Sequence, residues 1–111
     1  MTLQEIQQEH KVWATRNFGE ARDREYWHAF AGVVEEVGEL SHAILKQEQS
    51  IRGTWDKHEA LAQDAVGDII IYLIDLCNLR GWDISAILHT TWNHVKRRDW
   101  NKDPVNGGSE V

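Results

Sequence analysis

The sequence predicts an all-α protein, an antiparallel bundle of about four helices, on three observations. Its single proline, Pro104, lies near the C-terminus, so nothing before it forbids helix. Apolar residues recur at steps of three and four rather than alternating. The connections between the predicted helices are short, which favours antiparallel neighbours. With 111 residues, the chain is expected to be one domain whose modest core is completed by oligomerisation.

Helix boundaries follow from capping and breaking residues. Gly19 ends the first helix, Asp23 is a favourable N-cap for the second, and Gly81 is a good glycine to end the third. The predicted helices are residues 2–17, 23–49 and 56–81, and a fourth that starts at Asp83 or Ser85 and runs to about residue 100. We therefore expect a single helical domain over residues 1–100 and a flexible tail over residues 101–111.

Composition and charge exclude several classes of function. The formal net charge of −6 makes the chain a poor binder of duplex nucleic acid. No stretch reaches the roughly 18 apolar residues that a membrane span needs. Cys77 is the only cysteine, so no intrachain disulfide can form and a cytoplasmic location fits. Cys77 lies in an apolar run and is expected to pack rather than react.

The third predicted helix carries a stripe of carboxylates. Asp64, Asp68 and Asp75 fall within about 40° of one another at 100° per residue. Most other directions on this helix are apolar, which is typical of a buried helix, and Ile71 lies within the acidic stripe itself. Clustered carboxylates that lose hydration need a raised pKa or a cation. For Asp64 alone, a solvated helix face is the favoured interpretation.

The second predicted helix supplies a complementary acidic group, Glu35, Glu36 and Glu39, at helical spacing. Its large apolar stripe is expected to face the core: Trp27, Phe30, Val34, Val37, Ser41 and Ile44. A second stripe has mostly small residues that would let another helix approach closely: Ala29, Gly32, Glu36 and Ala43. If the third helix packs there, the two carboxylate groups meet. An all-carboxylate and water shell suits Mg²⁺ better than zinc.

These motifs resemble the MazG-like family of all-α nucleoside triphosphate pyrophosphohydrolases. The family pattern is EExxE on one helix and ExxD on the next, followed by an apolar run. EEVGE at residues 35–39 matches the first part, and DAVGDIIIYL at residues 64–73 is similar to the second. The resemblance covers residues 27–100, and the DAVGD form, with GWD and RDW downstream, is similar to small phage-type members. One position departs from it, because Ala65 stands where the family has glutamate.

The resemblance implies hydrolysis of a nucleoside or deoxynucleoside triphosphate to the monophosphate and pyrophosphate. It implies Mg²⁺, with Mn²⁺ as an alternative ion, held by Glu36, Glu39 and Asp68, with Asp64 as the fourth ligand. Glu35 would position or deprotonate the attacking water, or it is simply a surface residue; both interpretations remain open. The family also implies a homodimer or homotetramer, in the host cytoplasm if the gene is carried by a phage.

Substrate contacts are expected from basic and aromatic residues. The candidates for binding the nucleotide are Lys46, Trp55, Asn93, Lys96 and Arg98. The basic residues at the end of the last helix could instead only offset the helix dipole. Trp13 is a further candidate for stacking on a base.

The departure at Ala65 supports a different hypothesis. In this alternative the chain is a catalytically silent helical oligomer that binds a nucleotide or a protein partner. A nucleic-acid-binding role for KRRDWNK, residues 96–102, is disfavoured by the net acidity.

Overall fold

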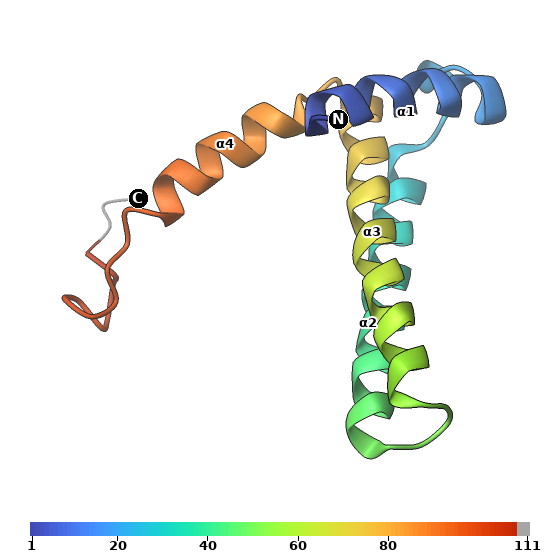
Figure 1. Cartoon of the computed structure of the whole chain (residues 1–111). Helices are drawn as coiled ribbons and strands as arrows, with labels where there is room; N and C mark the ends of the chain where they lie inside the picture. The colour runs from blue at the N-terminus through green and yellow to red at the C-terminus, as the bar shows by residue number, and fades with distance from the viewer. Residues whose placement is uncertain (109–111) are drawn as a thin grey trace.

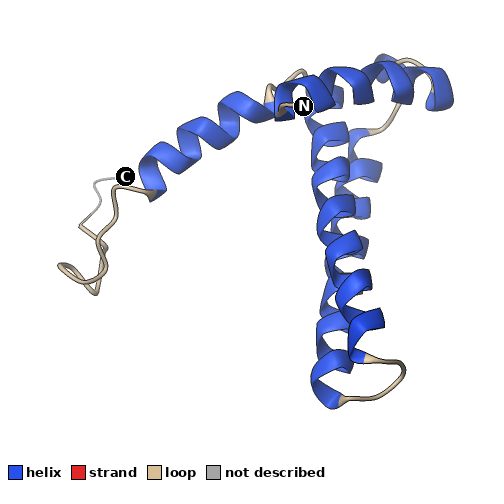
Figure 2. Cartoon of the chain, viewed as in Figure 1, coloured by secondary structure: helices blue, strands red, loops and turns tan. Residues whose placement is uncertain are grey.

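The computed structural model describes residues 1–108, and all of its regular structure is helical (Figures 1 and 2). The elements are α1 (Leu3–Phe18), the short 3₁₀ helix η1 (Ala21–Asp23), α2 (Tyr26–Gln49), α3 (Trp55–Arg80) and α4 (Ile84–Val95). The predicted all-α class is therefore confirmed. Among the described residues, no helix is both long and apolar enough to cross a membrane.

The helix ends follow local hydrogen-bonding rules. Thr2 and Glu5 form a capping box at the start of α1, and Thr54 caps α3 by accepting from the Lys57 N–H. Gly81 ends α3 with a φ of 71°, in the left-handed region that glycine adopts readily. The prediction that Asp23 caps the second helix was wrong, because residues 21–23 form η1 and α2 begins at Tyr26.

Helices α2 and α3 pack as a long antiparallel hairpin (Figure 1). Ala29 and Ala43 of α2 are each only 2% exposed at this contact. A Cβ on Gly32 would lie 2.4 Å from the Tyr72 ring, so glycine is what lets Tyr72 cross α2 there. The predicted close approach of a helix to the small-residue stripe is thus confirmed, and α3 is that helix.

The large apolar stripe of α2 is exposed, contrary to the expectation that it forms the core. Trp27, Phe30 and Val34 are 55%, 58% and 57% exposed, and Val37 and Ile44 are exposed as well. The physical reason is that α3 packs on the small-residue stripe, and no other element within residues 1–108 covers the opposite side. Among the residues that the structure describes, Ile74 is the only large side chain that is fully buried.

The other two helices leave the hairpin open. Helix α1 crosses one end of it, and α4 extends away from that same end (Figure 1). The radius of gyration is 17.6 Å, against about 13 Å for a compact chain of this length. The accessible surface is 8367 Å², whereas a compact monomer of this mass exposes about 6,300 Å². One chain alone therefore leaves roughly 2,000 Å² more surface open than a compact domain would.

The chain after α4 forms a hydrogen-bonded loop over residues 99–108, which includes the first part of the predicted tail, residues 101–111. The Asp99 N–H donates to the Gly107 carbonyl at 2.6 Å. The backbone N–H groups of Asn106, Gly108 and Val105 donate to the Asp103 carboxylate and lower its pKa. Residues 109–111 of the predicted tail lie outside the described residues.

Candidate metal centre and adjoining cavity

Three carboxylates gather on one turn and a half of α2. Glu35, Glu36 and Glu39 offer oxygen atoms that all lie within 4.8 Å of one another. Glu36 is buried against α3, while Glu35 and Glu39 are exposed. Exposed acidic clusters are common without a bound ion. Whether this cluster needs a cation therefore depends on its buried member, Glu36.

Glu36 is the buried carboxylate of this cluster, and one of its two oxygens lacks a partner. It is 8% exposed, and its Oε2 has no hydrogen-bond partner among residues 1–108. Burial raises the pKa of Glu36, and the neighbouring carboxylates of Glu39, Asp68 and Glu35 raise it further. A buried group of this kind is stabilised either by taking up a proton or by binding a cation.

The carboxylates of α3 have separate environments, although the sequence placed them on one stripe. Asp68 is half-buried and close enough to act electrostatically on Glu36. Asp64 is exposed, and neither it nor Asp68 joins the group of three close carboxylates. Asp75 is buried but paired with Arg24, at 3.0 and 2.8 Å. The chain therefore does not gather all four predicted ligands within one short distance.

Ala65 occupies the position where the resemblance led us to expect a glutamate. It is 3% exposed and, like Ala62 and His58, lies on the buried side of α3. Asp64, one residue earlier, is exposed. Its position on the helix therefore does not make it equivalent to a carboxylate at residue 65.

The predicted substrate-binding residues lie apart from the carboxylate cluster in this chain. Lys46 is on α2 beyond Glu39, and its Nζ donates to Gln49 Oε1. Trp55 is 60% exposed at the first residue of α3, beside the hairpin loop. Asn93 lies on α4, and Lys96 and Arg98 follow it, at the end that extends away from the hairpin (Figure 1).

A cavity of about 640 Å³ lies between α1, η1, α2 and α3. This volume is within the range of small-molecule binding sites. Asp68 lines it together with the aromatic rings of Trp13, Phe18 and Tyr72. Trp13 was a sequence candidate for base stacking, and it does line the cavity. The cavity itself could not be predicted, because its walls come from four separate segments.

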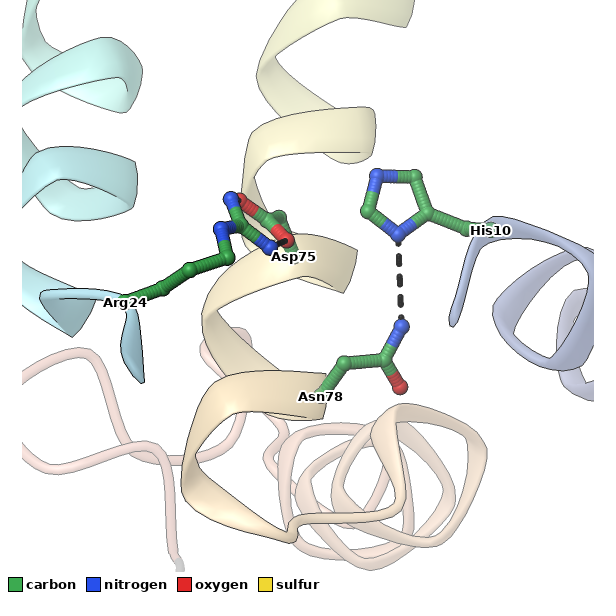
Figure 3. Close-up of polar contacts among 4 residues, drawn as sticks. All are labelled: His10, Arg24, Asp75 and Asn78. Carbon is green, nitrogen blue, oxygen red and sulfur yellow. Dashed lines mark hydrogen bonds and ion pairs between the residues drawn. The ribbon is translucent and has the colours of Figure 1, made fainter. Parts of the chain in front are cut away.

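Figure 3 shows the polar contacts among His10, Arg24, Asp75 and Asn78, of which the first three residues line the cavity. Arg24 and Asp75 form a bidentate ion pair, and Asn78 donates to His10 at 3.3 Å. Burial lowers the pKa of His10; the charge of Asp75 opposes this effect and that of Arg24 adds to it. Sequence reasoning did not single out His10, Arg24 or Asn78, because no local motif connects residues so far apart in the chain.

Comparisons of the chain with protein-family models, with curated proteins and with solved structures give no significant match. Any statement about function therefore depends on the motifs and on the geometry of this chain.

Proposed function

We propose that the protein is a Mg²⁺-dependent nucleoside triphosphate pyrophosphohydrolase. The observation that carries this proposal is Glu36, a buried carboxylate with an unpartnered oxygen inside a group of three carboxylates. The group has oxygen donors only, which suits a hard divalent cation. The resemblance of EEVGE and DAVGD to the MazG-like motifs supports the choice of reaction.

In this proposal Glu36, Glu39 and Asp68 hold Mg²⁺. The ion would polarise the α-phosphate and offset the charge of the triphosphate. Glu35, which is exposed beside Glu36, would orient a water molecule or accept its proton. Asp68 lies both near Glu36 and at the edge of the cavity, so the base and sugar would occupy the cavity while the phosphates lie at the carboxylates.

The proposal includes assembly with further copies of the chain, as a homodimer or homotetramer. Each chain leaves roughly 2,000 Å² more surface open than a compact domain does, and obligate interfaces bury about 2,000–5,000 Å² in total. The exposed apolar stripe of α2 suits such an interface. Assembly would also give Asn93, Lys96 and Arg98 a route to the carboxylates, because a second copy could supply them.

A second candidate is a non-catalytic oligomer that binds a nucleotide or a protein partner. Ala65 favours it, since the position of the expected fourth carboxylate is an alanine packed inside the hairpin. The cavity would then bind a ligand without turnover.

The test is to incubate the protein with each NTP and dNTP in the presence of Mg²⁺ and to separate the products by anion exchange. We expect monophosphate and pyrophosphate in equal amounts from at least one nucleotide. Glu39→Gln and Asp68→Asn should each lower kcat/KM on the order of 100-fold. The matched control is Glu48→Gln, the same change at an exposed residue of α2 outside the cluster, which should leave kcat/KM unchanged.

Two outcomes would reject parts of the proposal. Absence of pyrophosphate with every nucleotide would favour the non-catalytic candidate. Full activity in Asp68→Asn would show that the proposed ligand set is wrong. Asp64→Asn decides the fourth ligand, and the exposure of Asp64 leads us to expect a smaller loss than for Asp68→Asn.

A further inference from the structure

A network of hydrogen bonds joins α1 to the end of α3. It begins at two backbone groups, one of which can only donate and the other only accept. The Ile84 N–H donates to Gln7 Oε1 at 3.1 Å, and Gln7 Nε2 donates to the Trp82 carbonyl at 2.7 Å. A backbone N–H can only donate and a carbonyl can only accept. The orientation of the Gln7 amide is therefore determined.

Gln7 in turn determines the orientation of Asn78. Gln7 Nε2 donates to Asn78 Oδ1 at 3.0 Å, and Asn78 Nδ2 donates to the Gln7 backbone carbonyl at 3.2 Å. If the Asn78 amide were reversed, its nitrogen would face Gln7 Nε2, donor against donor, and its oxygen would face the Gln7 backbone carbonyl, acceptor against acceptor. The nitrogen of Asn78 is therefore the atom that faces His10 Nδ1, at 3.3 Å (Figure 3).

A donor facing His10 Nδ1 fixes the tautomer of the imidazole. Nδ1 must accept, so the proton of the neutral ring is on Nε2. His10 is 8% exposed, and burial, as the largest cause, lowers its pKa, so the ring stays neutral. His10 lines the cavity, and the hydrogen bond that its ring makes among residues 1–108 is the one at Nδ1. The network thus holds an N–H donor at the cavity wall.

Two charged residues that line the cavity with His10 are paired with each other. Arg24 and Asp75 bind each other through two hydrogen bonds, with both side chains largely buried. Asp68 lies at the edge of the cavity and belongs to the proposed metal centre. The other polar side chains that line the cavity include Asp23, Glu25 and His28, which are exposed, whereas His10 is buried. His10 Nε2 is thus the donor at the cavity wall whose proton the network fixes.

We propose that His10 Nε2–H donates to a hydrogen-bond acceptor, a carbonyl oxygen or an unprotonated ring nitrogen, on the heterocycle of the bound nucleotide. Asn78 is a positioning residue that sets the tautomer of His10 and does not itself contact the ligand. The identity of the ligand rests on the proposed function, whereas the tautomer does not. A heterocycle that presents an N–H to His10 would place two donors against each other and would bind more weakly.

The first experiment measures the tautomer directly, by long-range ¹H–¹⁵N correlation of the histidine rings in the full-length protein. His10→Gln assigns the signals. We expect His10 to show a protonated Nε2 and an unprotonated Nδ1 near neutral pH. A ring protonated mainly on Nδ1, or on both nitrogens, would overturn the proposal whether or not the protein is an enzyme.

The second experiment measures binding of the individual 2′-deoxynucleoside 5′-monophosphates with Mg²⁺, by tryptophan fluorescence and by the shift of the His10 Nε2 signal. His10→Leu should weaken the tightest binder about 10-fold, the value of one hydrogen bond. His10→Gln keeps an N–H donor and should stay within about threefold. The matched control is His89→Gln, because His89 is exposed on α4 away from the cavity and should bind as the native protein does.

Asn78→Asp tests the positioning role. A carboxylate cannot donate to Nδ1 but accepts from it, so in alkaline buffer the neutral His10 ring should carry its proton on Nδ1. Binding should fall as in His10→Leu, because Nε2 has become an acceptor. If the tautomer changes and binding does not, or if no monophosphate perturbs His10, recognition by His10 is rejected. If monophosphates bind as expected but no triphosphate is hydrolysed, the proposed enzyme activity fails and this inference stands.

Discussion

The two long faces of α2 differ in a way opposite to the usual distribution of side chains. Its inner face has the small residues Ala29, Gly32 and Ala43, and α3 seals it. Its outer face has large apolar residues such as Phe30 and Val34, and more than half of each is exposed. Large apolar residues are normally the ones found inside. The inner face, with its small residues, therefore forms the contact with α3. The outer face, with its large apolar residues, is suited to contact with a second protein surface.

The same division runs through the carboxylate cluster. Glu36 belongs to the inner stripe and is buried, while Glu35 and Glu39 point to the exposed side. One carboxylate thus loses its hydration while two remain accessible, within a group that spans 4.8 Å. A metal centre here would take ligands from both the buried and the exposed side of α2. A partner that covers the outer face would therefore lie next to the metal.

The largest effect is expected from placing a charge on the outer face. Val34→Asp should convert an oligomer to a monomer, because an unpaired carboxylate would be buried in the apolar contact. We expect the dissociation constant to rise at least about 100-fold, measured by light scattering after size-exclusion chromatography. Val105→Asp is the control, since Val105 is 81% exposed in the loop after α4. A native protein that is monomeric at all concentrations would reject the role given to this face.

The inner face is tested by a matched pair of glycines on α2. In Gly32→Ala the added Cβ would lie 2.4 Å from the Tyr72 ring, so the two helices must separate or the ring must move. We expect a net loss of about 1–2 kcal/mol, because overpacking outweighs the gain in helix propensity. In Gly38→Ala the Cβ meets nothing within 4 Å. That variant should gain about 0.5–1 kcal/mol. Equal losses in chemical denaturation of the two variants would contradict the assigned packing.

The sequence was enough to predict the helical class, the breaks at Gly19 and Gly81, and the approach of a helix to the Ala29–Gly32–Ala43 stripe. These depend on local propensity and on periodicity, which a single sequence contains. The sequence did not reveal that the stripe of Trp27, Phe30 and Val34 is exposed. Periodicity identifies an apolar face, but it does not show whether the same chain or another one packs against that face. Likewise the helical wheel grouped Asp64, Asp68 and Asp75, and only the fold separates them, since Arg24 comes from a distant segment.

An intermediate effect is expected from Mg²⁺ on thermal stability. If Glu36 is a ligand, Mg²⁺ at ten times its dissociation constant should stabilise the native protein by about 1.4 kcal/mol and raise its Tm. Glu36→Gln should lose this dependence while folding normally, because a neutral amide no longer needs a cation. Glu48→Gln, exposed elsewhere on α2, should respond to Mg²⁺ as the native protein does. Differential scanning fluorimetry against Na⁺ of equal ionic strength makes the measurement, and an unchanged Mg²⁺ response in Glu36→Gln would exclude this residue as a ligand.

The smallest effect is expected from His10, whose pKa in the folded protein is lowered from 6.5, chiefly by burial. Its neutral form fits the network with Asn78, so its contribution to stability is full above about pH 6.5 and is lost as the pH falls towards the lowered value. Asp75 and Arg24 are the charged groups that act on the ring, in opposite directions. Between about pH 7.5 and pH 5.5, the Tm of the native protein should therefore fall more than that of His10→Gln, which has no titrating ring. His28→Gln retains His10 and should follow the native curve. Parallel curves of Tm against pH for the native protein and His10→Gln would mean that the fold does not hold the His10 ring neutral.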